Sequence, residues 1–491
     1  MHENRAMPSE EELIAEREKK LAALQEKGIE PYPHGYDVQH TASALHEQYD
    51  SLPAEGKTQD EVSVAGRLLG FRNLGKITFA HIQDSTGKIQ LYFRKDDLKQ
   101  YDLLKMLDGG DWIGAKGTIF KSKQGELSVA VTSFQLLSKA LRPLPEKWHG
   151  LKDVEQRYRQ RYLDLTMNPE VKEVFKQRQT ILDTTRKVLR DKGYLEVEIP
   201  VLEPIYGGAE AKPFKSFLNA HKMTVYMRIA LELPLKKLLV GGFDKVFEIG
   251  KVFRNEDIDR SHNPEFTMME CYCAYGDYTT MMEITEEIYE QCALALHGKT
   301  KVTYGDHELE FKKPWPRMTM LEAIKKFSNI DAASMSKEDL MQHANPDDVK
   351  QGASRGELIN AIFEDKVESH LIQPTFITHH PWETCPLAKK CREDPEFAIE
   401  RFEPFACGME LANGYSELND PKRQKELFTA GEEKRQKGDE EAHPFDEDYI
   451  KALEHGMPPA GGLGIGIDRM TMLLTNKQSI RDVIIFPFMK H

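Results

Sequence analysis

A polar loop between two apolar segments is the feature that most constrains the fold of this chain. Residues 245–252 alternate like a strand, the loop begins after Phe253, and residues 266–275 are apolar again. This order predicts a hairpin of two antiparallel strands. Its loop presents Arg254, and arginine offers a forked set of donors that matches phosphate or carboxylate. Most charged loops are solvated turns, so the hairpin alone leaves the function open.

A glycine-spaced segment near the C-terminus adds a second constraint. Residues 461–469 read GGLGIGIDR. Glycine at alternate positions leaves one strand face bare, so that a flat ligand can approach the backbone. Arg469, at the start of the following helix, is suited to stack on a base and reach a phosphate. The spacing differs from the dinucleotide-binding fingerprint, and no βαβ unit follows.

A helix and a strand precede both segments. Residues 171–192 have helical periodicity that Gly193 ends, and residues 194–199 alternate as a strand that ends at Pro200. This helix, the arginine hairpin and the glycine strand are similar to motifs one, two and three of the class II aminoacyl-tRNA synthetases. The chain most closely resembles the bacterial-type lysyl-tRNA synthetases, at residues 226–233 (YMRIALEL), 262–270 (HNPEFTMME) and 413–420 (NGYSELND). The resemblance extends from about residue 62 to 487.

The expected fold class is α+β, with two principal parts. Short alternating strands and one helix (residues 98–107) between residues 62 and 137 predict a closed oligonucleotide-binding barrel. The resemblance implies a class II catalytic domain built on an antiparallel sheet. The expected division is a helical extension over 1–57, the OB-fold anticodon-binding domain over 58–142, a linker over 143–169, and the catalytic domain over 170–491, with a helical insertion at about 317–381.

Composition sets the class of protein. The 491 residues are 40% hydrophobic and 30% charged, no apolar run approaches the roughly 20 residues of a membrane span, and residues 1–5 do not begin a signal peptide. We therefore expect a cytoplasmic protein without a membrane partner. The net charge of −13 disfavours nucleic acid as a partner of the whole surface, so any tRNA contact must be local.

Six cysteines are too few for a disulfide framework in a chain of this length. A zinc site would need to gather His379, His380, Cys385 and Cys391, but no C-x-x-C pair supports it. We therefore expect no zinc site.

The resemblance implies a tRNA site on the barrel. Phe79 would stack on an anticodon base, and the neighbouring hydrogen-bonding residues would be Arg67, Gln90 and Glu126. Alternation alone leaves open whether Phe79 lies in the barrel core instead, because Phe79 and His81 share one face.

The resemblance also implies ATP-dependent activation of L-lysine and transfer to lysine tRNA. Arg254 and Arg469 would be the catalytic residues, and Arg254 would touch both the amino-acid carboxylate and the α-phosphate. The ATP site would comprise Arg254, Glu256, His262, Asn263, Phe266 and Arg469. Mg²⁺ would be held by Glu403 and Glu410, and the number of ions stays open.

A substrate ammonium needs carboxylates when it is buried. The expected lysine pocket comprises Gly208, Glu232, Glu270, Tyr272, Asn413 and Glu417. Glu232 and the backbone of Gly208 would face the α-amino group, Glu417 and Tyr272 would face the ε-ammonium, and the division of Glu270 between the two stays open.

The sequence departs from the family pattern at two places. Ser261 stands where an arginine is usual before the hairpin histidine, which leaves open whether Arg260 reaches the γ-phosphate. Leu231 replaces the proline before the pocket glutamate, and Pro234 follows, so the helix start could be displaced.

Two alternatives are an aspartate- or asparagine-type synthetase and a non-charging paralogue. Three pocket carboxylates argue against the first. The barrel, Arg254 and Arg469 argue against the second. The resemblance also implies a homodimer, with the 171–192 helix and the strand that ends at Pro200 at its interface.

Overall fold

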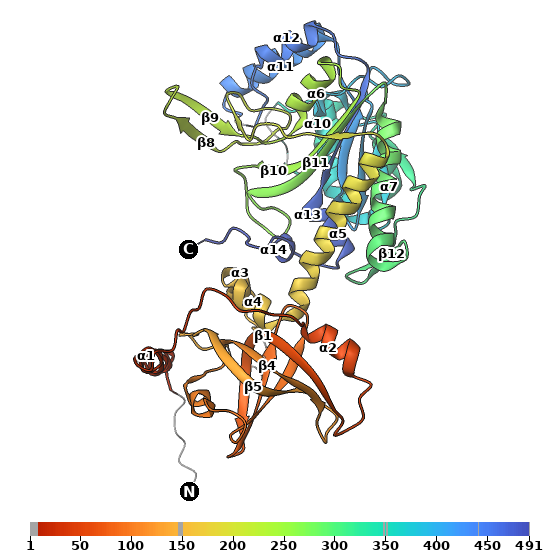
Figure 1. Ribbon diagram of the computed structural model, residues 1–491. Helices are drawn as coiled ribbons and strands as arrows, with labels where there is room; N and C mark the ends of the chain where they lie inside the picture. The colour runs from red at the N-terminus through yellow and green to blue at the C-terminus, as the bar shows by residue number, and fades with distance from the viewer. Residues whose placement is uncertain (1–7, 146–150, 347–348, 350–351, 440, 491) are drawn as a thin grey trace. The chain divides into compact units, whose positions relative to one another are not determined.

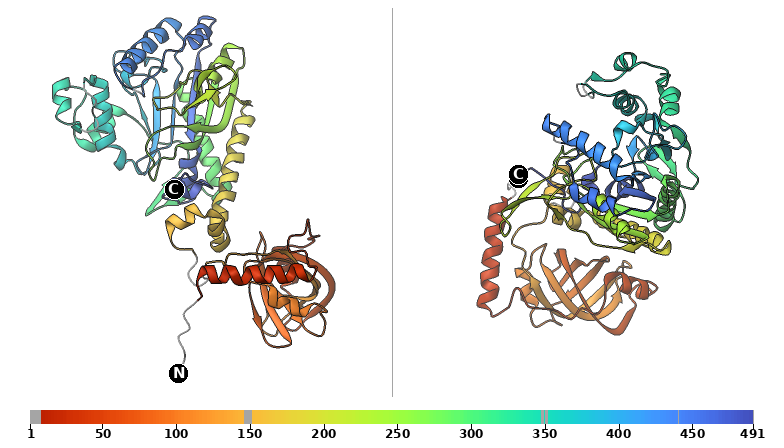
Figure 2. Two further views of the ribbon diagram at one scale, coloured as in Figure 1. Left: turned by 90° about the vertical axis from the view of Figure 1, so that its left-hand side faces the viewer. Right: turned by 90° about the horizontal axis from the view of Figure 1, so that it is seen from above.

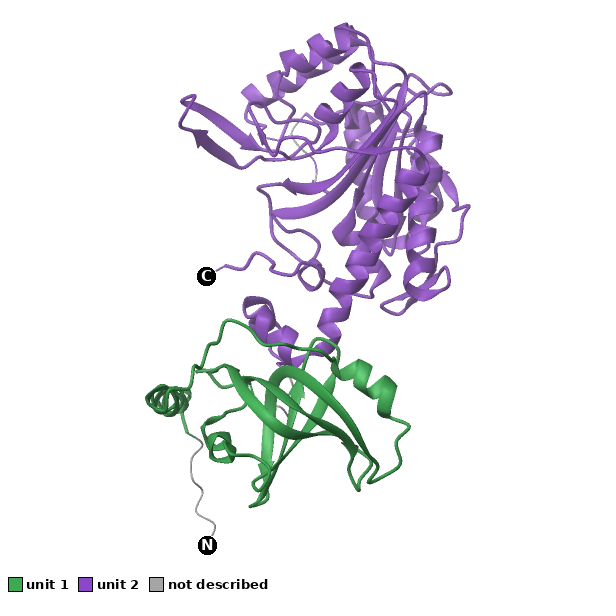
Figure 3. Cartoon of the chain, viewed as in Figure 1, with its two compact units in different colours: residues 1–150 green, residues 151–491 purple. Residues whose placement is uncertain are grey.

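The computed structural model describes residues 8–145, 151–346, 349, 352–439 and 441–490. The chain forms two compact units, residues 1–150 and residues 151–491 (Figure 3). The sequence expectations for residues 1–5 and for the part of the linker at 146–150 lie outside the described residues. Every helix in the described ranges is too short or too polar to cross a membrane.

The first unit is a closed five-stranded barrel with the strand order β1-β2-β3-β5-β4 (Figure 1). Its elements are α1 (Glu10–Glu26), α2 (Ala42–Tyr49), β1 (Lys57–Asn73), β2 (Ile77–Gln83), β3 (Lys88–Arg94), the 3-10 helix η1 (Tyr101–Met106), β4 (Trp112–Lys121) and β5 (Leu127–Ser138). The segment expected as a helix at 98–107 is therefore a shorter 3-10 turn. The barrel closes through the antiparallel pairing of β1 with β4, two strands that are distant in the sequence.

Burial along β2 resolves the alternative left open for Phe79. Ala80 and Ile82 point into the core, and Phe79 and His81 are partly exposed on the opposite face. Phe79 is therefore not a core residue. Leu24 of α1 and Leu45 of α2 are buried in the same core as the strands. The described part of the expected helical extension, from residue 8 on, thus packs as part of the barrel unit.

The second unit is built on a nine-stranded sheet. Along the sheet the order is β14-β15-β16-β18-β19-β11-β10-β6, and β17 pairs with β16. The strands are β6 (Leu195–Glu196), β10 (Lys245–Phe253), β11 (Glu265–Ala274), β14 (Arg317–Thr319), β15 (Thr375–Thr378), β16 (Arg401–Ala406), β17 (Met409–Glu410), β18 (Ala412–Ser416) and β19 (Ala460–Gly466). The centre of the sheet is antiparallel, and the edge pairs β10–β6 and β14–β15 are parallel.

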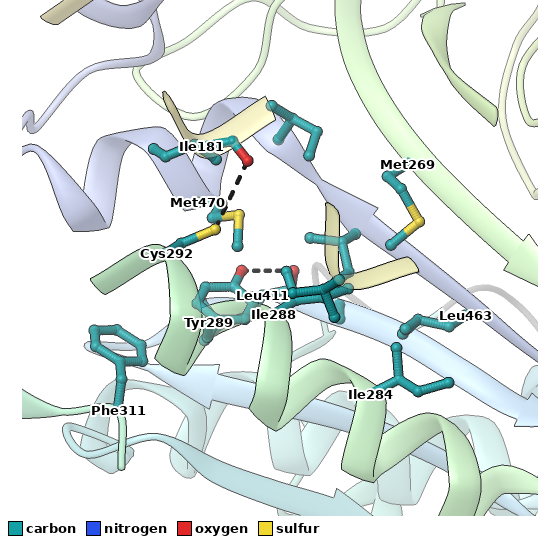
Figure 4. Packing of buried hydrophobic residues seen from close by; sticks show 14 of the residues in the cluster. Ile181, Met269, Ile284, Ile288, Tyr289, Cys292, Phe311, Leu411, Leu463 and Met470 are labelled. Carbon is teal, nitrogen blue, oxygen red and sulfur yellow. Dashed lines mark hydrogen bonds between the residues drawn. The ribbon is translucent and has the colours of Figure 1, made fainter. Parts of the chain in front are cut away.

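Helices cover both faces of this sheet (Figure 1). α5 (Pro169–Asp191) packs against α7 (Tyr278–His297), and both join α13 (Ile467–Leu474) in a core with the sheet residues Met269 and Leu463 (Figure 4). A second core beneath α6 (Glu232–Val240), α11 (Pro421–Gln436) and α12 (Glu447–Glu454) receives Tyr272 and Tyr415. Alternate residues of β11 therefore enter opposite cores, as a pleated strand requires.

The remaining elements surround this framework. They are α3 (Val154–Arg159), α4 (Arg161–Met167), β7 (Leu202–Glu203), β8 (Lys215–Leu218), β9 (Met223–Met227), β12 (Lys301–Tyr304), β13 (His307–Glu310), the 3-10 helix η4 (Trp382–Thr384) and α14 (Ile480–Val483). α3 and α4 belong to the second unit, although residues 143–169 were expected to be a linker.

A helical module interrupts the sheet between β14 and β15. It comprises α8 (Met320–Ser328), α9 (Lys337–Met341), α10 (Arg355–Lys366) and the 3-10 helix η3 (Glu368–His370), and Figure 2 shows it at one side of the sheet. Leu340 and Leu358 belong to its own core. The expected insertion at 317–381 was too long at both ends, because Arg317–Thr319 and Thr375–Thr378 hydrogen-bond as sheet strands.

The strand expected at 194–199 is also shorter than the pattern suggests. Only Leu195–Glu196 pairs with β10. The backbone N–H of Ile199 instead donates to Oε2 of Glu248 at 2.8 Å. A side-chain acceptor thus replaces the next rung of the ladder.

The barrel gives a matched test of side-chain orientation. Phe93 is fully buried and packs edge-on against Phe134, with ring centroids 5.5 Å apart. Phe93→Ala should lower barrel stability by about 3–5 kcal/mol through the cavity it leaves. Phe79→Ala should cost about 1 kcal/mol or less, because it mainly loses one ring contact with Tyr92. Hydrogen exchange of barrel amides in the full chain measures both, and equal losses would contradict the outward placement of Phe79.

Candidate functional site

A cavity of about 460 Å³ opens in the second unit beside the central strands. Its lining comes from the β10–β11 hairpin, from β16 to β19, and from the starts of α6 and α13. Thirteen of the fourteen residues expected in the catalytic domain line it: Gly208, Glu232, Arg254, Glu256, His262, Asn263, Phe266, Glu270, Tyr272, Glu403, Glu410, Asn413 and Arg469. Glu417 is the expected residue that does not.

The hairpin fixes the first group of these residues. β10 and β11 pair from Lys245–Cys273 to Phe253–Glu265, and the backbone N–H of Arg254 donates to the carbonyl of Pro264 at 3.0 Å. The Arg254 guanidinium then lies 5.3 Å above the centre of the Phe266 ring. A cation and an aromatic face therefore share one wall of the cavity.

Arg469 connects the hairpin loop with β17. Its guanidinium donates to the backbone oxygen of Glu410 at 3.2 Å and to Oε2 of Glu410 at 3.4 Å, and it lies 3.3 Å from Nε2 of His262. The other ring nitrogen of His262 is 2.8 Å from Asp259. Ser261 lines the cavity, whereas Arg260 is exposed and outside the lining.

Asn263 braces the loop from inside. Its side-chain amide donates to the carbonyl of Glu265 at 2.6 Å, and its oxygen accepts from the backbone N–H of Phe488 at 3.3 Å. Asn263 is buried, so both of its polar ends are used by backbone groups.

An ion pair that the sequence analysis missed ties three elements together. Arg178 of α5 lies 2.7 Å from Asp468 at the start of α13, and the other oxygen of Asp468 accepts from the backbone N–H of Thr267 on β11 at 2.6 Å. The detectable signal is the position of Arg178, four residues after buried Val174 and therefore within the apolar stripe of the helix. A charge at such a position predicts a buried partner.

Two pocket carboxylates, Glu270 of β11 and Glu232 of α6, lie close enough for their charges to interact. Oε1 of Glu270 accepts from the backbone N–H of Leu231 at 2.9 Å, and Oε2 accepts from the Tyr272 hydroxyl at 2.8 Å. Glu232 accepts from the Tyr415 hydroxyl at 2.5 Å. Burial, together with the negative charge of Glu232, raises the pKa of Glu270 to about 7.

Glu417 lies immediately behind the cavity wall. It is fully buried and forms an ion pair with Lys236 of α6, which also pairs with Glu232. A Cβ atom on Gly462 would lie 1.8 Å from Oε1 of Glu417. The carboxylate therefore touches the backbone that lines the cavity. Lys236 escaped the sequence analysis, although its i,i+4 spacing from Glu232 is the usual signal of a helical ion pair.

The glycine strand is used differently from the expectation. A Cβ on Gly462 would also lie 2.5 Å from the Tyr272 ring, and one on Gly464 would lie 2.7 Å from Met268. At these two positions the bare face accommodates the protein's own side chains. Gly466 has open space instead, with Cβ of Arg469 4.0 Å away as its nearest neighbour.

Pro234 leaves the start of α6 in place. The helix begins at Glu232, with Leu231 as its N-cap. Pro234 falls in the first turn, where backbone N–H groups have no partner within the helix and a missing donor costs little. Gly208 has φ +86°, and a Cβ there would lie 3.0 Å from Cβ of Glu232, which explains why glycine packs beside the carboxylate.

A second group of carboxylates lines the same cavity. Glu403 pairs with Arg401, and burial together with repulsion from Glu403 raises the pKa of Glu410. Burial and the nearby Glu364 raise the pKa of Glu368 to about 8. These oxygen donors, crowded together, suit a hard divalent cation such as Mg²⁺. Sequence reasoning missed Glu364 and Glu368, which the helical module contributes.

Of the four residues weighed for zinc, His379 and Cys391 lie close together. Within the described residues, the group of three possible ligands is His379, Cys391 and Glu393, whose ligand atoms lie within 4.8 Å of one another, and Glu393 is 79% exposed. His380 and Cys385 are not part of that group. Burial raises the pKa of the Cys385 thiol to about 11, and Cys385 lines the main cavity instead.

The barrel carries a separate groove of about 1150 Å³. Phe79, Gln90 and Glu126 line it together, and Glu126 accepts from Gln90 and pairs with His81, both at 2.6 Å. Arg67 does not line this groove, because its guanidinium stacks 4.8 Å from the Trp112 ring and donates to the carbonyl of Gly110.

Three aromatic rings follow one another on the groove face. Tyr92 lies 5.3 Å from both Phe79 and Phe120. Successive exposed rings are the usual platform for stacking single-stranded bases. Alternation on β3 and β4 was the signal by which Tyr92 and Phe120 could have been found.

Comparison with known proteins assigns both units. Residues 153–490 match the family described as tRNA synthetases class II (D, K and N), and residues 62–137 match the OB-fold nucleic acid binding domain. The class is therefore a class II tRNA synthetase with an anticodon-binding type of barrel.

Full-length relatives narrow this class. The chain is 51% identical over 489 residues to a protein named lysine–tRNA ligase from Moorella thermoacetica, with 99% of each chain covered. It is 52% identical to the protein of the same name from Pelotomaculum thermopropionicum, over 98% of this chain and 95% of the other. It is 51% identical to the protein of the same name from Methanoculleus marisnigri, over 96% of this chain and 94% of the other. The chain belongs to the lysine–tRNA ligase family of class II tRNA synthetases.

Glu270 should titrate near neutral pH. Its carboxyl C=O band, isolated as the infrared difference between the protein and its Glu270→Gln variant, should lose intensity with a midpoint near pH 7. Glu232→Gln should lower that midpoint, because it removes the neighbouring negative charge. Glu265→Gln, on the exposed end of the same strand, should leave it unchanged. A midpoint near the ordinary value of 4.5 would contradict the buried environment described here.

Proposed function

We propose that this protein ligates L-lysine to lysine tRNA in an ATP-dependent reaction through a lysyl-adenylate, releasing AMP and diphosphate. The observation that carries the proposal is that one cavity is lined by both a forked cation and buried carboxylates. Arg254 suits a carboxylate and a phosphate, and Glu232 with Glu270 suits an ammonium. The names of the full-length relatives support the same substrate.

The activation step joins two anions, the amino-acid carboxylate and the α-phosphate. Arg254 would hold both, align the attack and stabilise the charge that develops on the phosphoryl oxygens. The position of its guanidinium over Phe266 supports this role, because the ring limits its motion. Glu256 would accept a hydrogen bond from the adenine amino group. Phe266 and Arg469 would enclose the adenine ring. His262 and Asn263 would contact the triphosphate and the ring.

The lysine side of the cavity would recognise two ammonium groups. Glu232 and the Gly208 backbone would take the α-ammonium, and Glu417 and Tyr272 would take the ε-ammonium. Asn413, held by Arg401 at 3.1 Å, would complete the wall. Glu270 lies between, and an arriving ammonium would displace its proton, since a cation favours the ionised carboxylate.

Mg²⁺ would bind at the second group of carboxylates. Glu403 and Glu410 would hold it, and the raised pKa of Glu410 supports a place for added positive charge. When bound, the ion would neutralise phosphate charge. Arg469, which contacts Glu410, would keep this carboxylate in position.

An aspartate- or asparagine-type enzyme fits less well. Such substrates carry an acidic or amide side chain, which three buried carboxylates would repel or leave unpaired. The family matched by residues 153–490 includes all three specificities, so the pocket carboxylates and the full-length relatives carry the distinction. A non-charging paralogue would lack amino-acid activation, which the exchange assay below measures.

Several wider properties follow as proposals. A homodimer is supported by large apolar side chains that stay exposed after α5, among them Leu195, Leu202 and Phe217. A cytoplasmic location is supported by six free cysteines, which suit a reducing compartment. The barrel groove would read the anticodon through Phe79, Gln90 and Glu126.

Activation should depend on the fork of Arg254. Diphosphate exchange into ATP, tested with each amino acid in turn, should require lysine. Arg254→Ala should lower this exchange on the order of a hundredfold or more, and Arg254→Lys should recover little of it, because an ammonium cannot make the bidentate contact. Exchange with aspartate or asparagine but not lysine would favour the sibling specificity, and no exchange at all would favour the paralogue.

Charging should depend on the Phe79 ring independently of activation. Base stacking on an aromatic side chain contributes roughly 1–3 kcal/mol, so Phe79→Ala should raise the KM for tRNA about tenfold to a hundredfold. Phe79→Trp keeps a stacking face, so its KM for tRNA should stay close to that of the parent. Lysine-dependent exchange without tRNA should not change in either variant. An unchanged KM for tRNA in Phe79→Ala would remove this residue from the tRNA site.

A further inference from the structure

A lysine side chain of the protein itself lies beside the proposed lysine pocket. Lys236, on the second turn of α6, is fully buried, and its ammonium contacts the carboxylates of both Glu232 and Glu417. The same ammonium lies 5.4 Å from the centre of the Tyr415 ring. A buried ammonium is tolerated only when opposite charges meet it closely, and here the two carboxylates hold the pKa of Lys236 above its ordinary value despite burial.

The two carboxylates depend on Lys236 to different degrees. Glu232 also accepts a hydrogen bond from the Tyr415 hydroxyl at 2.5 Å. The two oxygens of Glu417 are buried, and among the described residues no other hydrogen-bond donor meets them. Lys236 is thus the one counter-charge that the described structure gives Glu417, whose Oε1 lies against Gly462 at the cavity wall.

The charges of the pocket match the substrate only when Lys236 is included. Glu232, Glu270 and Glu417 supply three negative charges when ionised, and Lys236 supplies one positive charge, which leaves two negative charges. Free lysine carries two ammonium groups and one carboxylate, and Arg254 faces the carboxylate. Three uncompensated carboxylates would exceed the two ammonium groups, and one of them would have to take up a proton.

We propose that Lys236 is a positioning residue that determines the charge of the amino-acid pocket. It neutralises one of three buried carboxylates and fixes Glu417 and Glu232 at the spacing that two ammonium groups of one substrate require. It acts through these carboxylates from behind the wall, since it does not line the cavity. This inference rests on the proposed activation of lysine.

The test compares two adjacent lysines of α6. Lys236→Met removes the buried charge at nearly constant volume. Lys237→Met is the matched control, because Lys237 is partly exposed and pairs with Asp448 at the surface. In lysine-dependent exchange, Lys236→Met should raise the KM for lysine about a hundredfold or more, because breaking a buried charged pair leaves a carboxylate without its partner. Its KM for ATP should stay within about twofold of the parent, and Lys237→Met should resemble the parent in both.

The double variant Lys236→Met/Glu417→Gln keeps the test decisive if Lys236→Met fails to fold, because it removes both charges of the pair. If Lys236 acts through Glu417, the KM of the double variant for lysine should equal that of Glu417→Gln alone. The effects of the two substitutions should then not be additive. A lysine KM unchanged in Lys236→Met, equal losses for lysine and ATP, or full additivity in the double variant would overturn the inference. A parent protein without lysine-dependent exchange would overturn the proposed function itself.

Discussion

The register of three central strands is the constraint on which the site depends. β19 lies between β11 and β18, and its glycines stand opposite the functional side chains: Gly464 faces both Glu270 and Asn413, and Gly462 faces both Tyr272 and Tyr415. Because glycine has no side chain, residues from both neighbouring strands can lean over the central strand. A slip of one residue would turn every one of them to the opposite face. β19 therefore both joins β11 to β18 in the sheet and places the functional residues of these two strands.

Burial of Glu270 in the cavity lowers the stability of the folded protein once its carboxyl group is ionised. Glu270 is more easily protonated in the folded protein than in the unfolded chain, since burial raises its pKa from 4.5 to about 7. The folded state then binds more protons across that interval, so its contribution to stability is present below pH 4.5 and is lost as the pH rises through 7. A substrate ammonium beside Glu270 would restore the stability that is lost when the Glu270 carboxyl group ionises. Lys236 is a permanent counter-charge for Glu417 and Glu232. The same set of charges therefore affects both folding and substrate recognition.

Sequence alone predicted the parts of this arrangement that have a local signature. The periodicity of α5, the hairpin and the glycine strand all depend on neighbouring residues, and the family resemblance then assigned the cavity residues. What escaped prediction is long-range or too short to show a period. The pairing of Arg178 with Asp468 crosses 290 positions of the chain, and β14 has only three residues. Alternation placed Phe79 on a face without showing which face was the core, because that depends on barrel closure.

The distribution of charge reconciles an acidic chain with a polyanionic partner. The net charge of −13 describes the whole molecule, but exposed charges are screened beyond about 8 Å at physiological ionic strength. The barrel groove has a different balance, with five basic residues (Lys57, Arg72, Arg94, Lys121, Lys123) against three acidic ones (Glu55, Asp97, Glu126), a surplus of two positive charges. This local surplus of positive charge lies on the face that carries the aromatic rings, and it would attract a nucleic-acid backbone to that face. A negative net charge is therefore compatible with a nucleic-acid partner, provided that the contact is confined to such a local surface.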